Sequence, residues 1–245
     1  LAGIAAETAE ERVAAKVVLS HLTLNDLRNS PAVPYEEDEV TRIIQDAVNE
    51  TIFNEFKNMT VAEFREWLLS ESTTTEMIRH ASRGLTSEIV AGVCKLMSNL
   101  DLIYAAKKMR VSAHCNTTIG LPGTFSSRLQ PNHTTDDPKG IIASVMEGLS
   151  LGCGDAVIGI NPVDDSVESV ARLLKMLNEF KNKWEVPTQC SVLAHITTQV
   201  EAAEKFGAPL DMVFQSIAGS QKGNEAFGVT VQMIQDGRDM VLSKG

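Results

Sequence analysis

The sequence contains no run of about 18 or more apolar residues, and this absence excludes a helix that spans a membrane. It has only four cysteines among 245 residues, which is too few for a disulfide framework. Cys94, Cys115, Cys153 and Cys190 lie too far apart for zinc-finger spacing, so we expect small buried thiols. Because the HExxH, EF-hand and paired-cysteine motifs are also absent, a metal ion held by protein ligands is not expected.

Basic residues are in deficit, since 22 lysines and arginines stand against 32 acidic residues, and the formal net charge is −10. A protein with this charge repels phosphate, which argues against nucleic acid as a partner. Hydrophobic residues make up 43% and charged residues 22%, which excludes collagen-like, coiled-coil and disordered proteins. A sequence of this length buries roughly 70% of its extended surface on folding. It can therefore form a sizeable core.

The first 110 residues show helical spacing of apolar side chains and no strand alternation. Helices are predicted at 8–19, 36–48, 60–69 and 85–109. Thr8 and Glu11 fit a capping box at the start of the first helix, and Thr60 and Glu63 fit one at the start of the third. We therefore assign residues 1–110 to an N-terminal helical region.

From residue 111 onward, short apolar runs alternate with helical patterns. Strands are predicted at 115–121, 155–160, 189–194 and 212–217, and helices at 139–149, 166–180, 197–206 and 224–234. This alternation predicts an α/β fold with a parallel sheet, and the largely apolar strands indicate a sheet covered on both faces. Four strand–helix units are half of a (β/α)8 barrel or most of a doubly wound sheet. We assign residues 111–245 to this region.

Polar residues gather where the predicted strands end, and in parallel α/β folds this edge of the sheet forms the active-site face. Arg128 and Gln130 follow the first strand, and their spacing places both on one side of an extended segment. Asn161 ends the second strand and is held extended by the proline after it. A guanidinium and two amides suit a small ligand with hydroxyl or amine groups. The alternative is a surface arginine and amides that bind the main chain.

His195 ends the third predicted strand and has two interpretations. It is either a hydrogen-bonded structural residue at a strand–helix junction or an acid–base group of a site. The paired acids at 136–137 and 164–165 precede helices, so helix capping explains them better than metal binding. The glycine-rich segments 152–154 and 219–223 match neither the dinucleotide fingerprint nor the Walker A loop.

Several long strings of residues resemble the large subunits of ethanolamine ammonia-lyases. The strings are 116–132 (NTTIGLPGTFSSRLQPN), 154–163 (GDAVIGINPV), 187–189, 192–195, 214–217, 85–90 and 101–109. They run through nearly the whole sequence and are far more specific than a sparse motif. The resemblance implies a (β/α)8 TIM barrel with an N-terminal helical region. The 245 residues would be an N-terminal portion that holds about the first four βα units.

The resemblance also implies an activity. Such proteins are carbon–nitrogen lyases that convert ethanolamine to acetaldehyde and ammonia by adenosylcobalamin-dependent radical chemistry. The implied substrate-binding residues are Arg128, Gln130 and Asn161, and the implied cobalamin contacts are Pro162, Gln215 and Ser216. Arginine and amide side chains suit this chemistry because they orient the substrate and stabilise developing charge.

The implied partners are ethanolamine, the small subunit and further copies of the large subunit, in a cytoplasmic location within a bacterial microcompartment. In this family, carboxylates for the substrate ammonium come from the second half of the barrel. Residues 1–245 by themselves are therefore expected to be inactive. Two alternatives stay open: a truncated, non-catalytic scaffold portion of such a subunit, or a different TIM-barrel enzyme, such as a hydrolase built around His195 and Asp155.

Overall fold

The structure, a computed structural model, describes residues 6–244. The protein forms two compact units. One contains the residues up to Arg110 together with Gly219–Lys222, and the other contains Val111–Ala218 and the residues from Gly223 onward. The outermost residues of the two expected regions, 1–5 and 245, lie outside the described part. No helix among residues 6–244 combines the length and apolar character that a membrane crossing requires.

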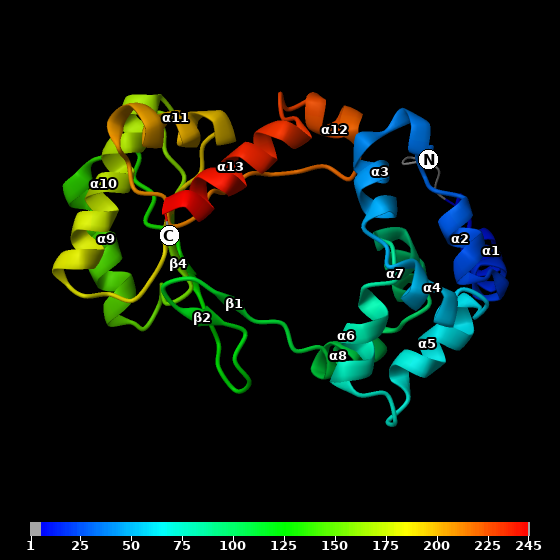
Figure 1. Ribbon diagram of the computed structural model, residues 1–245. Coiled ribbons are helices and arrows are strands. Elements are labelled where there is room, and N and C mark those ends of the chain that lie inside the picture. The colour runs from blue at the N-terminus through cyan, green and yellow to red at the C-terminus, as the bar shows by residue number, and fades with distance from the viewer. Residues whose placement is uncertain (1–5, 245) are drawn as a thin grey trace. The chain divides into compact units, whose positions relative to one another are not determined.

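The first unit is helical in its described residues (Figure 1). Its elements are α1 (Ala9–His21), α2 (Leu24–Asn29), the 3-10 turn η1 (Tyr35–Glu37), α3 (Glu39–Asp46), α4 (Glu50–Phe56), α5 (Val61–Leu69), α6 (Thr75–Ser82), α7 (Ser87–Lys95) and α8 (Asn99–Lys108). Their apolar faces meet in one core around Leu24, Phe53, Val61, Phe64 and Ile89. The segment Gly219–Lys222 joins this unit through Gln221, whose backbone N–H donates to Asp38 Oδ1 at 2.6 Å.

Capping side chains decide where these helices begin. The predicted box at α5 is confirmed, because Thr60 accepts from Glu63 N at 3.1 Å and the Glu63 carboxylate accepts from Thr60 N at 2.7 Å. The box at α1 is only half formed. Thr8 Oγ1 accepts from Glu11 N at 3.1 Å, but the Glu11 carboxylate accepts from the N–H of Glu7.

The single long helix predicted at 85–109 is wrong. Ser98 and Asp101 form a capping box that starts α8 as a separate helix, with 2.9 Å between Ser98 N and Asp101 Oδ2. A local polar pair thus interrupts an apolar pattern that continues through it.

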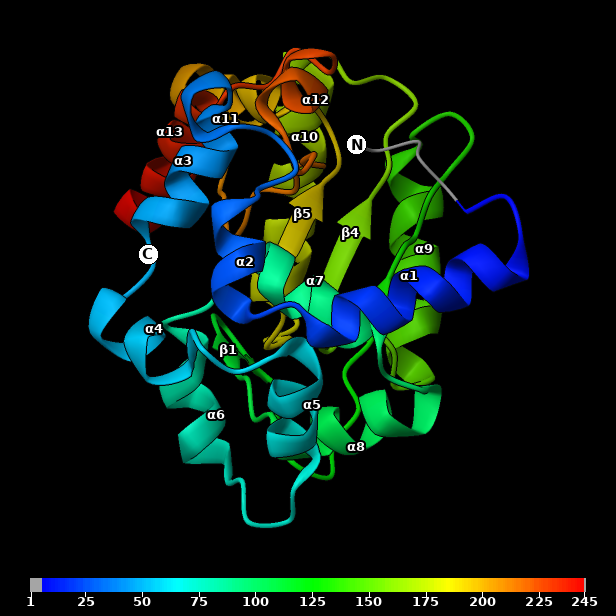
Figure 2. The same ribbon diagram turned by 90° about the vertical axis from the view of Figure 1, so that its right-hand side faces the viewer.

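The second unit has α/β architecture. Its elements are β1 (Ala113–His114), β2 (Thr118–Ile119), β3 (Arg128–Leu129), α9 (Pro138–Ser150), β4 (Val157–Ile160), α10 (Val167–Lys183), β5 (Cys190–Val192), α11 (Ile196–Phe206), α12 (Gln221–Glu225), which begins in the other unit, and α13 (Val231–Lys244). Strands β3, β4 and β5 form a parallel sheet in that order, with β4 and β5 side by side (Figure 2). No closed barrel is found within the described residues.

Two of the four predicted strands are confirmed, as β4 and β5. The prediction at 115–121 is wrong in its pairing, because β2 pairs antiparallel with β1 in a hairpin and stays outside the parallel sheet. The first parallel strand is Arg128–Leu129, so Arg128 lies in a strand and does not follow one. Residues 212–217 form no strand. The helix predicted at 224–234 is wrong, because the backbone is not helical at Gly228, where φ is +72°. The helix α12 ends before this glycine and α13 begins after it.

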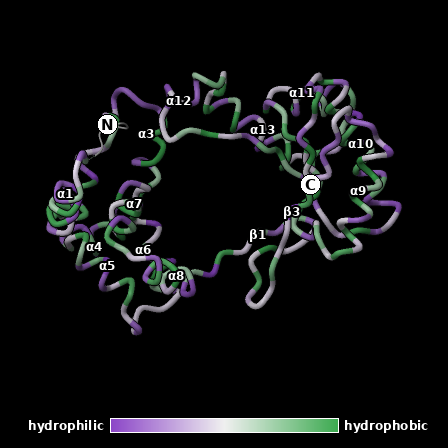
Figure 3. Tube along the Cα trace, turned by 180° about the vertical axis from the view of Figure 1, so that it is seen from behind, coloured by the Kyte–Doolittle hydropathy of each residue, from purple (hydrophilic) through white to green (hydrophobic). Residues whose placement is uncertain are grey.

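The parallel sheet has one apolar face and one polar face, which corrects the expectation of two apolar faces. Ile158, Ile160, Cys190 and Val192 pack into the core formed with α9, α10 and α11. Figure 3 shows hydrophobic and hydrophilic stretches alternating along these helices, as expected when only one side of a helix meets a sheet. The opposite face of the sheet carries Arg128, because side chains alternate along a strand.

We expect Gly84→Ala to lower the free energy of unfolding of the first unit. A Cβ at this position would lie 2.7 Å from the backbone nitrogen of Phe53 and 3.0 Å from the carbonyl carbon of Ile52, so the backbone of α4 must move. The expected loss is about 1–3 kcal/mol, measured by urea unfolding followed by circular dichroism. Gly219→Ala is the control, because a Cβ there meets nothing within 4 Å. Equal unfolding midpoints for the two variants would contradict the argument.

Candidate functional site

The candidate site lies on the polar face of the parallel sheet and includes Arg128 of β3 and Asn161, the residue after β4. Arg128 of β3 is opposite Val157 of β4, and Leu129 is opposite Ile158. Leu129 packs toward α9, since a Cβ on Gly148 would lie 2.5 Å from Leu129 Cδ1. The alternation along β3 therefore places Arg128 on the other face, away from the helices.

The guanidinium of Arg128 is held by two apolar surfaces. Its Cζ lies 4.7 Å from the ring centroid of Phe214, in cation–π geometry. Its Nε and Nη2 would each be 2.8 Å from a Cβ on Gly159, so that edge of the guanidinium lies against the bare α-carbon of this glycine. Both nitrogens are buried and have no hydrogen-bond partner.

Asn161, the residue after β4, contributes an unpaired hydrogen-bond acceptor, whereas the unpaired atoms of Arg128 are donors. Its Oδ1 is buried without a partner, while its backbone N–H donates to Asn132 Oδ1 at 2.9 Å. A buried donor or acceptor without a partner costs about 1–3 kcal/mol. Donors on Arg128 and an acceptor on Asn161 together suit a small ligand that carries both hydrogen-bond acceptors and donors.

The loop after β4 is fixed by Asp136, for which the sequence pattern indicated helix capping. Asp137 alone caps α9, accepting from Gly140 N at 2.9 Å. Asp136 is buried, has a φ of +51°, and accepts from the N–H groups of Val163 and Asp164 at 2.8 and 2.9 Å. Asp136 itself lies just before α9, and the sequence alone did not reveal its positive φ or its contacts with the loop after β4.

The remaining predicted residues lie near the same end of the sheet but differ in their contacts. Gln130 is exposed just beyond β3, and Pro162 is half-buried. Gln215 Oε1 accepts from Ile196 N at 2.8 Å, and its Nε2 donates to the backbone oxygen of Ser216 at 3.0 Å. Ser216 itself is exposed. Gln215 thus joins its segment to the start of α11.

His195 and Asp155 lie at opposite ends of the sheet, so the structure does not bring them together. His195 follows β5 and caps α11, with its Nδ1 2.7 Å from Thr197 Oγ1. Asp155 precedes β4 and accepts from Ser127 N at 2.7 Å and from Ser127 Oγ at 3.0 Å. The hydrogen bond from the backbone of Ser127 holds the pKa of Asp155 below its ordinary value. A hydrolase built on this pair has no geometric support.

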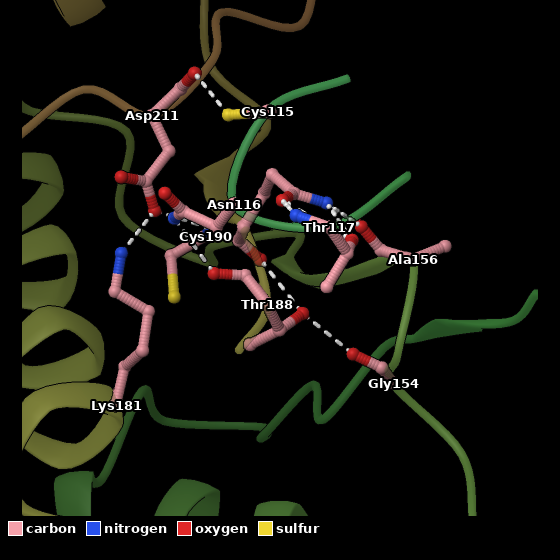
Figure 4. Close-up of polar contacts among 10 residues, drawn as sticks. Cys115, Asn116, Thr117, Gly154, Ala156, Lys181, Thr188, Cys190 and Asp211 are labelled. Atoms are coloured by element: carbon pink, nitrogen blue, oxygen red, sulfur yellow. Dashed lines mark hydrogen bonds and ion pairs between the residues drawn. The ribbon is translucent and has the colours of Figure 1, made fainter. Parts of the chain in front are cut away.

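The amino ends of β4 and β5 are closed by a hydrogen-bonded network (Figure 4). Asn116 Nδ2, in the β1–β2 turn, donates to the backbone oxygen of Thr188 at 2.9 Å. Thr188 Oγ1 donates to the backbone oxygen of Gly154 at 2.6 Å, and Thr117 N donates to Gln189 Oε1 at 2.9 Å. The unpaired side-chain atoms near the sheet lie elsewhere, with Arg128 Nε and Nη2 against Gly159 and Asn161 Oδ1 just after β4.

Asp211 extends the network to the segment that sequence predicted as a fourth strand. Its Oδ2 accepts from Lys181 Nζ at 2.6 Å and from Cys190 N at 2.9 Å (Figure 4). Lys181 is nearly buried, so this ion pair compensates a charge that has lost most of its water. Asp211 therefore fixes the backbone beside β5 just before Phe214.

The cysteines meet the expectation of buried thiols only in part. Cys190 is buried, and burial raises the pKa of its thiol to about 12. Cys153 is partly buried, whereas Cys94 and Cys115 are exposed. Among residues 6–244, no group of three or more metal-ligating side chains is assembled.

Comparison with known proteins identifies close relatives along the whole sequence. Residues 1–245 match the family model for the ethanolamine ammonia lyase large subunit. The protein is 55% identical over 238 residues to the ethanolamine ammonia-lyase large subunit of Escherichia coli (strain K12), covering 97% of this chain and 52% of that protein. The ethanolamine ammonia-lyase large subunit of Salmonella typhimurium (strain LT2) matches with the same identity and coverage. The chain spans about half the length of the curated relatives it matches.

We expect iodoacetamide to modify Cys94 and Cys115 in the native protein at pH 8 and to leave Cys190 unmodified. The thiolate is the reactive form, and a thiol with a pKa of about 12 stays protonated at that pH. Mass spectrometry after digestion measures the modification of each cysteine, and the same reaction in urea is the control, in which all four should react. Equal native labelling of Cys190 and Cys115 would contradict the burial argument.

Proposed function

This chain belongs to the family of ethanolamine ammonia-lyase large subunits, and we propose that it forms part of the substrate site of such an enzyme. The reaction cleaves a carbon–nitrogen bond and converts ethanolamine into acetaldehyde and ammonia. The observation that carries the proposal is that unsatisfied donors and an unsatisfied acceptor lie on the same face of the sheet. Arg128 Nε and Nη2 are buried donors without acceptors, and Asn161 Oδ1 is a buried acceptor without a donor.

Each of these groups has a role that its chemistry suits. Arg128 donates to the substrate hydroxyl oxygen and stabilises negative charge that develops there. Asn161 Oδ1 accepts a hydrogen bond from the substrate hydroxyl or amine, and Gln130 adds an amide at the exposed rim of the site. These contacts hold the hydroxyl-bearing carbon of the substrate in a fixed orientation. Orienting the substrate is the main contribution that the protein makes to a radical reaction.

The ammonium group of ethanolamine needs an anionic partner that these three residues do not supply. Arg128 is positive, and Gln130 and Asn161 are neutral, so none of them compensates a buried ammonium. Because the chain spans about half the length of its relatives, we assign the carboxylates to residues outside it. This assignment gives Arg128 the hydroxyl end of the substrate and leaves the amine end for the missing carboxylates.

The proposed cofactor is adenosylcobalamin, with Pro162, Gln215 and Ser216 as its contacts in this chain. The residues fit a large, partly apolar group, because Val163 and Ile217, next to Pro162 and Ser216, are 67% and 66% exposed. Gln215 is fixed by its bond from Ile196 N, so it offers a rigid edge to a ligand. When bound, the cofactor supplies the carbon radical that removes hydrogen from the hydroxyl-bearing carbon of the substrate.

The proposal extends to the fold and to the assembly. The three parallel strands are the start of a (β/α)8 TIM barrel, with residues 1–110 as an N-terminal helical region and residues 111–245 as its first half. The partners are the small subunit and other copies of the large subunit, with no nucleic acid and no membrane. A cytoplasmic location within a bacterial microcompartment is part of the same proposal. The family description as a large subunit supports the small subunit as a partner.

We expect Arg128→Ala in the assembled enzyme to lower kcat/KM for ethanolamine by about thirtyfold to a thousandfold, because one charged hydrogen bond at the reacting group is worth about 2–4 kcal/mol. Steady-state ammonia release measures the effect, and circular dichroism verifies that the variant folds. Arg172→Ala, which removes an exposed arginine from α10, is the control. Unchanged kcat/KM in Arg128→Ala would remove this residue from the site.

We expect Asn161→Ala to raise KM for ethanolamine more than it raises Kd for adenosylcobalamin, since Pro162 and not Asn161 is assigned to the cofactor. Substrate kinetics and a spectrophotometric cobalamin titration give the two constants on the same preparation. Asn161→Asp keeps an acceptor oxygen in place and should retain more substrate affinity than the alanine variant. A large loss of cobalamin binding with an unchanged KM would reverse the assignment.

A further inference from the structure

We propose that Phe214 and Gly159 are positioning residues that form a seat for the guanidinium of Arg128. The inference rests on the proposed function, because it concerns how the substrate-binding arginine is oriented. It assigns a role to one aromatic and one small residue that make no polar contact of their own with a ligand.

The first observation is that Arg128 has no anionic partner to hold it. Within residues 6–244, the side chain of Arg128 forms no ion pair, and its buried Nε and Nη2 have no hydrogen-bond partner. An arginine that lines a site is commonly oriented by a carboxylate, which also neutralises part of its charge. Here the orientation comes from packing alone, so the positive charge of the guanidinium is not compensated by any other side chain of the described residues.

The second observation is the contact with Gly159. A Cβ at this position would lie 2.8 Å from Arg128 Nε, 2.8 Å from Nη2 and 3.0 Å from Cζ. Even the smallest side chain would therefore displace the guanidinium from the sheet. Gly159 lies in the middle of β4 and is opposite Ser191 of β5, so its position is fixed by the ladder on that side.

The third observation is the ring of Phe214, whose centroid is 4.7 Å from Arg128 Cζ. Phe214 is itself fixed by Gln199 of α11, a fully buried residue. Gln199 Nε2 donates to the backbone oxygen of Phe214 at 2.9 Å, and Phe214 N donates to Gln199 Oε1 at 3.3 Å. The same Nε2 donates to the backbone oxygen of Ala194 at 2.7 Å, so the amide links Phe214 to the end of β5.

The seat has a consequence for substrate orientation. A guanidinium whose charge is not neutralised repels an ammonium and attracts an oxygen that develops negative charge. Ethanolamine carries an ammonium group at one end and a hydroxyl oxygen at the other. Arg128 in this seat therefore selects the orientation in which the hydroxyl faces Arg128 and the ammonium faces away, and a displaced guanidinium loses that selection.

The test of the ring compares Phe214→Leu with Phe214→Tyr in the assembled enzyme. A cation–π contact in a desolvated site is worth about tenfold to thirtyfold in rate, so we expect this loss of kcat/KM for the leucine variant and little loss for tyrosine, which keeps the ring. Phe206→Leu, at the end of α11, is the matched control. A purely structural role would lower the thermal midpoint and the activity of both Phe214 variants together.

Chemical rescue separates positioning from packing. Arg128→Ala leaves the seat vacant, and we expect guanidinium ion at millimolar concentration to restore part of the lost activity. The double variant Arg128→Ala with Phe214→Leu should show no such rescue. Rescue of equal size in the two backgrounds would overturn the inference.

Gly159→Ala provides an independent test if Phe214→Leu fails to fold. We expect it to lower kcat/KM nearly as far as Arg128→Ala does, and the double variant to be no worse than Arg128→Ala alone, because both changes remove the same interaction. Additive losses would overturn the inference. If Arg128→Ala itself keeps normal kcat/KM, the proposed function fails; if it is crippled while Gly159→Ala and Phe214→Leu stay active, only the seat fails.

Discussion

The alternation of side chains along β4 sends Ile158 and Ile160 into the helical layer and leaves Gly159 and Asn161 on the other face. The first pair, fully buried, fixes the register of the strand, because a shift by one residue would exchange the two faces. The polar face is therefore a by-product of the same packing that stabilises the sheet. Arg128, one strand away, is set by the same register.

The segment from Asp211 to Ser216 shows how a polypeptide can follow a sheet without joining it. In place of a backbone ladder, three side chains fix it: Asp211 binds Cys190 N, Gln199 binds both backbone groups of Phe214, and Gln215 binds Ile196 N. Side-chain amides can satisfy a backbone donor and acceptor at once. Both backbone groups of Phe214 are thereby paired, and its ring contacts the guanidinium of Arg128.

Sequence predicted the features that depend on local chemistry. Thr60 and Glu63 identify the start of α5 because both partners of the cap lie within one helical turn. At residues 85–109 it overlooked a local capping box formed by Ser98 and Asp101. Its other failures lie where a distant partner decides the outcome. The run 212–217 has the composition of a strand, but a strand exists only when a neighbour pairs with it. The sequence pattern puts Arg128 after a strand, because a two-residue strand with a charged member has no apolar pattern to reveal it.

The assignment of Arg128, Gln130 and Asn161 to the substrate rests on resemblance and stays a prediction. The part of Phe214 could not be found that way, since a phenylalanine in an apolar run predicts only burial.

The seat around Arg128 also imposes an order on biosynthesis. A nascent polypeptide emerges from its amino end, so β3, β4 and β5 can pair as soon as Val192 has left the ribosome. At that stage Gln199 and Phe214 have not yet emerged from the ribosome, and the guanidinium of Arg128 is still hydrated. Its water is removed only when the later segment folds back onto the finished sheet. The guanidinium therefore loses its water only after a folded core exists, and the free energy of that core offsets the cost of dehydrating the charge.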